Sequence, residues 1–73
     1  MDHHKLEEIG EKLRSLGHDR REVVHEIMAD ARQGQAEDGR RLYQQLDRIS
    51  EECISLMERQ RALIAQQLND GQH

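Results

Sequence analysis

The chain has 73 residues and a single cysteine, so it is long enough for one small domain and cannot form an intrachain disulfide. Its 11 basic and 15 acidic residues give a net charge of −4, which argues against a strongly basic nucleic-acid-binding protein. No apolar run approaches the ~20 residues of a membrane span, and residues 1–8 lack the apolar segment of a signal peptide. We therefore expect a cytoplasmic protein with no membrane segment.

The composition predicts an all-α fold in a single domain, residues 1–73. Proline and phenylalanine are absent and Tyr43 is the only aromatic residue, whereas Glu, Gln, Arg, Leu and Ala, which favour helices, dominate the chain. Valine occurs only at positions 23 and 24, and threonine does not occur, so β-strands have few of the residues that they prefer.

The first helix is predicted at about residues 2–16, where apolar residues recur at spacings of three and four: Leu6, Ile9, Leu13 and Leu16. A helix break is predicted at Gly17–His18, because glycine favours a left-handed C-cap. Asp19 with Glu22 then forms a capping-box pattern for a second helix. The alternative is one continuous helix over residues 2–33, because the apolar spacing nearly keeps its phase across the glycine.

The second helix is predicted at about residues 20–33, with a broader apolar face: Val23, Val24, Ile27, Met28 and Ala31. Residues 34–39, GQAEDG, are predicted to form a loop, because two glycines bracket them and Asp38 can cap a following helix. This gives two short helices before a long one, as a three-helix arrangement or a helical hairpin.

The long third helix is predicted at about residues 39–69, followed by a frayed tail at 70–73. One row keeps a heptad spacing: Leu42, Leu46, Ile49, Cys53, Leu56 and Leu63. A second row flanks it: Tyr43, Ile54, Met57, Ile64 and Leu68. Together the two rows cover about half of the helix circumference, which is wider than one neighbouring helix needs.

An apolar strip therefore remains on the long helix whichever way the two short helices pack. We expect Leu63, Ile64 and Leu68 to lie beyond the reach of two short helices folded on each other. A second molecule is predicted to cover this strip, most simply in a homodimer through the long helix. The predicted interaction residues are Tyr43, Met57, Leu63, Ile64 and Leu68.

The sequence offers no pattern of catalytic residues or metal ligands. Cys53 falls in the heptad row and is interpreted as a small apolar side chain, because no base is placed beside it by sequence. His18 and His25 lack partners at zinc-ligand spacing. A free amino terminus with His3 can bind Cu(II), as in any chain with histidine at that position. We expect no enzyme activity, no cofactor and no metal.

The segment Tyr43–Ile49, YQQLDRI, resembles the Ser-Gln-Glu-Leu-Asp motif on the second helix of the sporulation-type aspartyl-phosphate phosphatases, which are helical hairpins. Gln44, Leu46 and Asp47 match this motif, whereas Tyr43 and Gln45 stand in place of its serine and glutamate. The match covers five residues of a Gln- and Leu-rich helix, so the chain is not assigned to that family.

The function predicted from these patterns is a small non-enzymatic protein–protein interaction module, acting as a regulator, adaptor or inhibitor of another protein. The alternative is a dimeric nucleic-acid-binding regulator, either helix-turn-helix-like or an RNA-binding helical hairpin. The basic residues that would contact nucleic acid are the pairs Arg20–Arg21 and Arg40–Arg41, together with Arg59 and Arg61. Nucleic acid is the less favoured partner, because acidic residues accompany these arginines.

Overall fold

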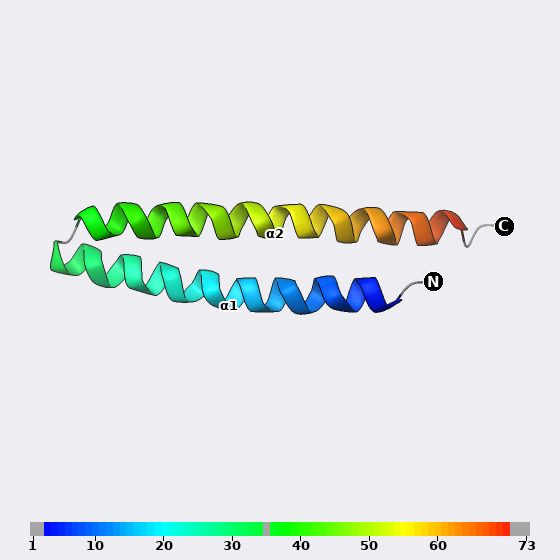
Figure 1. The fold of residues 1–73 in the computed structure, drawn as a ribbon, viewed down its shortest axis with the longest axis horizontal. Coiled ribbons are helices and arrows are strands. Elements are labelled where there is room, and N and C mark those ends of the chain that lie inside the picture. The colour runs from blue at the N-terminus through cyan, green and yellow to red at the C-terminus, as the bar shows by residue number, and fades with distance from the viewer. Residues whose placement is uncertain (1–2, 35, 71–73) are drawn as a thin grey trace.

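The computed structural model describes residues 3–34 and 36–70, which form two long α-helices. Helix α1 (His3–Gln33) and helix α2 (Ala36–Asp70) lie antiparallel and side by side as a helical hairpin (Figure 1). The described residues contain no β-strand, so the predicted all-α class is confirmed. The predicted first residue of helix one, Asp2, and the tail residues 71–73 lie outside the described part of the chain.

The two helices pack along one row of residues on each, which we call the seam. On α1 the seam comprises Leu6, Ile9, Leu13, Leu16, Val23 and Ile27. On α2 it comprises Leu42, Leu46, Ile49, Cys53, Leu56 and Leu63. All of these side chains are buried or half-buried. Their alternating spacing of three and four residues is that of a two-stranded coiled coil, with Arg20 filling the one gap on α1.

The predicted break at Gly17–His18 is wrong, because α1 runs through both residues as one helix. Glycine in a helix interior costs about 1 kcal/mol relative to alanine. Burial of a single large apolar side chain contributes about 1.5–3 kcal/mol. A break at Gly17 would pull the seam residues on one side of it away from α2, so packing along the whole seam outweighs the local capping signal. The three-helix arrangement is therefore replaced by a two-helix hairpin.

The turn between the helices is shorter than the predicted loop at 34–39. Gly34 has a φ of 74°, in the left-handed region that glycine adopts without strain. Its backbone N–H donates to the carbonyl oxygen of Ala31, with an N···O distance of 3.3 Å, as in a Schellman C-cap. Helix α2 begins at Ala36, three residues before the predicted start at Gly39. Within the predicted loop, Gln35 lies outside the described residues.

The core of the hairpin is thin. Among the described residues only Ile9, Val23 and Ile49 are buried hydrophobics, and no side chain is fully enclosed. A pair of helices has no further layer of structure to cover it, so the side chains beside the seam on each helix remain largely exposed. Small domains usually compensate for such a core with a disulfide, a metal or a second subunit.

Candidate functional site

One broad side of the hairpin is polar, and we call it the charged side. Its residues each directly precede a seam residue or one of the polar residues that continue the seam's heptad spacing, which are Arg20, Gln60 and Gln67. They are Lys5, Lys12, Asp19 and Glu26 on α1, and Gln45, Glu52, Arg59 and Gln66 on α2. Lys12 and Arg59 line one groove between the helices, and Glu26 and Glu52 line another. These shared linings show that the residues preceding the seam on both helices face the same side of the molecule.

The opposite broad side, which we call the apolar side, carries the residues that follow the seam. On α2 these form a row of large side chains, which we call the ridge: Tyr43, Ile54, Met57, Ile64 and Leu68. Their exposed fractions range from 44% to 65%, although large apolar side chains are commonly buried. Four of the five lie between Ile54 and Leu68, so the ridge is a stripe along the C-terminal half of α2, with Tyr43 as a separate part nearer the turn.

Helix α1 contributes small residues to the apolar side, and we call their row the trough: Gly10, Gly17, Val24 and Ala31. Gly10, Gly17 and Val24 directly follow seam residues, as Tyr43 and Met57 do on α2, and Ala31 continues the same seven-residue interval. A Cβ atom built at Gly10 or at Gly17 meets nothing within 4 Å, so packing inside the hairpin does not require glycine there. Beside the trough, Met28 is also exposed, so the apolar side extends onto α1.

A polar bridge crosses the apolar side near its middle. The Nε of Arg20 donates a hydrogen bond to Oγ of Ser50, at 3.0 Å, between the two helices. Ser50 interrupts the ridge, and Arg20 stands where the heptad spacing between Leu16 and Val23 would place a seam residue. This exposed hydrogen bond adds to the seam packing in favouring one register of the two helices.

In this register, each residue of α1 lies at the same position along the hairpin axis as a particular residue of α2. We call that shared position its level. Leu16 with Glu52 and Val23 with Gln45, which all line the groove on the charged side, have numbers that add to 68, and Arg20 with Ser50, which the bridge joins, have numbers that add to 70. Residue n of α1 therefore lies at about the level of residue 68 − n of α2. By this relation, Gly10 and Gly17 each fall one residue from the levels of Met57 and Ser50.

The predicted interaction residues divide between two places. Tyr43, Met57, Ile64 and Leu68 all lie exposed on the ridge. Leu63 is half-buried in the seam, because the two short folded helices beyond whose reach it was expected to lie are one continuous helix. Since α1 is one helix of 31 residues against 35 in α2, it covers the seam of α2 nearly to its end.

The sequence analysis missed Gly17 as part of the same surface, because it was interpreted as a cap. The signal that finds it is the seven-residue interval from Gly10 to Gly17, which places both glycines on one face of a continuous helix. Gly10 itself stands next to Ile9 and is half-buried beside the seam.

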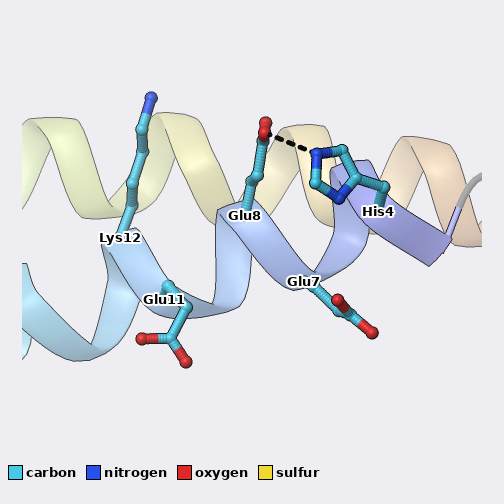
Figure 2. A pocket seen from close by; sticks show the side chains of 5 residues that line it. All are labelled: His4, Glu7, Glu8, Glu11 and Lys12. Atoms are coloured by element: carbon cyan, nitrogen blue, oxygen red, sulfur yellow. Dashed lines mark ion pairs between the residues drawn. The ribbon is translucent and has the colours of Figure 1, made fainter.

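A second candidate site lies on the outer surface near the start of α1. His4, Glu7, Glu8, Glu11 and Lys12 line it, all from one helix (Figure 2). His4 Nε2 and a carboxylate oxygen of Glu8 are 3.1 Å apart, while Glu7 and Glu11 point to the other side of the helix. No group of three or more His, Cys, Asp or Glu side chains among the described residues is arranged to hold a metal ion. This surface therefore lacks the convergent ligands of a metal site.

The arginine pairs of the nucleic-acid alternative are dispersed along the hairpin. Arg40–Arg41 lies near the turn, Arg20–Arg21 near the middle of α1, and Arg59 and Arg61 near the opposite end. Within the described helices, no stretch has the length and hydropathy that crossing a membrane demands. No protein-family model, curated protein or solved structure matches this chain.

Proposed function

We propose that this protein is a non-enzymatic protein–protein interaction module that binds through its apolar side, acting as a regulator, adaptor or inhibitor of its target. The observation that carries the proposal is the ridge, a stripe of five large apolar side chains that stay exposed along α2. Apolar anchors at helical spacing are the way in which amphipathic helices recognise other proteins.

The ridge supports binding because folding of the hairpin does not account for it. The seam and the Arg20–Ser50 hydrogen bond join α1 to α2 without using the ridge, and the charged side shows that the other flank of the same helices is polar. Five large side chains in water along a helix of 35 residues form an apolar patch unusual for a small monomer. Met57 adds a flexible side chain that adapts to an irregular partner surface.

The test is capture of partners by the tagged full chain, comparing two double variants of α2. The ridge variant carries Met57→Glu and Ile64→Glu. The control carries Gln45→Glu and Gln66→Glu on the charged side, so both variants gain two negative charges at exposed positions. We expect wild type and control to capture the same proteins, additional copies of the chain included, and the ridge variant to lose them, because charges buried without a partner are costly.

Far-UV circular dichroism confirms that both variants remain helical, as expected for substitutions at exposed positions. Capture of the same proteins by the ridge variant as by wild type would contradict the proposal. The nucleic-acid alternative has weaker support, because its arginines are interspersed with acidic residues and lie at separate levels of the hairpin.

A further inference from the structure

We propose that the apolar side is occupied by a second copy of this chain, related by a two-fold axis parallel to the long axis of the hairpin. In this arrangement the ridge of each copy lies in the trough of the other, and the four helices form an antiparallel bundle with both turns at the same end. The inference rests on the proposed function and names its partner and its geometry.

The first support is the pair of glycines in the trough. Gly10 and Gly17 both lie inside α1, where glycine lowers helix stability, and the space beside each is open in the single hairpin. Their absent side chains leave a hollow in α1 next to the projecting ridge of α2. A two-fold axis along the hairpin brings a hollow opposite a ridge twice, so one surface is complementary to itself.

The second support is the register. An axis parallel to the helices leaves every residue at its own level, so residue n of α1 meets about residue 68 − n of the partner's α2. Met57 then lies over the partner's Gly10, and Tyr43 over the partner's Val24. At these two levels a large side chain meets a smaller one, as close packing between helices requires. Elsewhere Ile54 comes to the level of the partner's Arg14 and Ile64 to that of the partner's His4.

The third support is charge complementarity at the edges of the same surface. Glu7 and Arg21 lie beside the trough, and Asp47 and Arg61 lie beside the ridge, all of them exposed. At equal levels Glu7 meets the partner's Arg61, and Arg21 meets the partner's Asp47. Both pairs join opposite charges, which favours this alignment over one displaced along the axis.

The size of the surface also suits a dimer. The hairpin measures 60 Å by 15 Å across the Cα atoms of both helices, or about 900 Å². A standard protein interface takes about 800 Å² from each partner. The other two-fold arrangement, with the axis across the hairpin, sets ridge on ridge and trough on trough, and so leaves the space beside the glycines unfilled.

The orientation is tested by spin labels on the full chain, with Cys53→Ala removing the native thiol. Arg32→Cys places a label beside the turn, and His18→Cys places one near the middle of α1, both at exposed positions. In the proposed bundle we expect both labels to give a short distance between copies, roughly 20–35 Å for helices packed 8–10 Å apart. The label near the middle is the control, because it gives a short distance in either arrangement.

With the axis across the hairpin, the labels beside the turns lie at opposite ends. Arg32 is 14 residues from His18, or about 21 Å at 1.5 Å per residue, so these labels would be about 42 Å or more apart. That distance would overturn the orientation. A monomer by light scattering across the concentrations of the capture experiment would overturn the inference as a whole. If the monomeric chain still captures other proteins through the ridge, the proposed function stands although the dimer does not form.

Two sets of variants test the contacts themselves. Gly10→Leu with Gly17→Leu fills the trough and should weaken self-association at least tenfold, whereas the matched change Ser15→Leu on the outer surface should not. Glu7→Arg alone should weaken the dimer several-fold, and adding Arg61→Glu should restore it. Unchanged association of the glycine variant, or no rescue by the second charge reversal, would contradict the proposed pairing of ridge and trough.

Discussion

The charged side and the apolar side of the hairpin flank the same seam, yet they differ in composition. On the charged side, Lys12 and Glu26 directly precede seam residues, while on the apolar side Gly10, Val24 and Tyr43 directly follow them. The seam needs neither kind of neighbour, because it already supplies the burial that holds the two helices together. The difference between the sides therefore supports the proposal that the charged side faces water and that the apolar side binds a partner.

The charged side also tolerates unfavourable neighbours that a buried surface would not. Four acidic residues and Arg48 line one groove, and three basic residues and Glu8 line the other, so charges of one sign predominate in each. Exposed charges interact weakly because water and salt screen them. Placing an unpaired charge on the apolar side has a larger cost if that side is covered.

The largest expected effect is the difference in stability lost when a seam residue and a ridge residue of α2 are truncated. Ile49 is buried in the seam, whereas Ile54 lies half-exposed on the ridge. We expect Ile49→Ala to lower the free energy of unfolding by about 2–4 kcal/mol, as truncation of a buried side chain does. Ile54→Ala should cost under ~1 kcal/mol when the chain is dilute. Urea unfolding followed by far-UV circular dichroism measures both, and equal losses would contradict the division between seam and ridge.

A smaller effect tests the continuity of α1 beneath the apolar side. In the ridge variant, which we expect to be monomeric, Gly17→Ala should raise the free energy of unfolding by up to about 1 kcal/mol, because alanine favours a helix interior and its Cβ meets open space. Thermal unfolding at one protein concentration measures the change. A loss of stability would instead indicate that Gly17 adopts the left-handed conformation of a helix C-cap.

A still smaller effect is expected on the charged side. Glu52→Gln removes one of the like charges in its groove and should raise the free energy of unfolding by about 0.3 kcal/mol at low ionic strength. The gain should shrink as salt is added. Glu51→Gln is the matched control, because the neighbouring Glu51 is exposed and does not line the groove. Equal gains from both would show that overall charge, rather than this groove, is responsible.

The smallest expected effect is on nucleic acid. Because acidic side chains separate the arginine pairs, we expect no sub-micromolar affinity for duplex DNA at physiological salt. Fluorescence anisotropy with labelled duplexes measures the affinity. Tight binding that weakens steeply with salt would favour the nucleic-acid alternative and assign the charged residues a direct role.

Much of the fold could be predicted from particular residues. The seam on α2, from Leu42 to Leu63, follows from its heptad spacing, and the second row beside it follows from the helical rotation per residue. The error lay at Gly17, where the local pattern of a C-cap followed by Asp19 and Glu22 competed with the longer apolar period. Local capping contributes about 1 kcal/mol, so a seam of several buried side chains decides against it.

The sequence by itself determined an all-α chain with two apolar rows on its C-terminal helix, because periodicity is a property of spacing alone. Only the tertiary structure decided that α1 is one helix, and that Gly10 and Gly17 lie beside the ridge rather than on a remote surface. The physical reason is that the side on which a helical residue lies depends on where the neighbouring helix packs. Once α1 and α2 pack along the seam, the direction of each neighbouring side chain is fixed, and with it the contrast between the two sides.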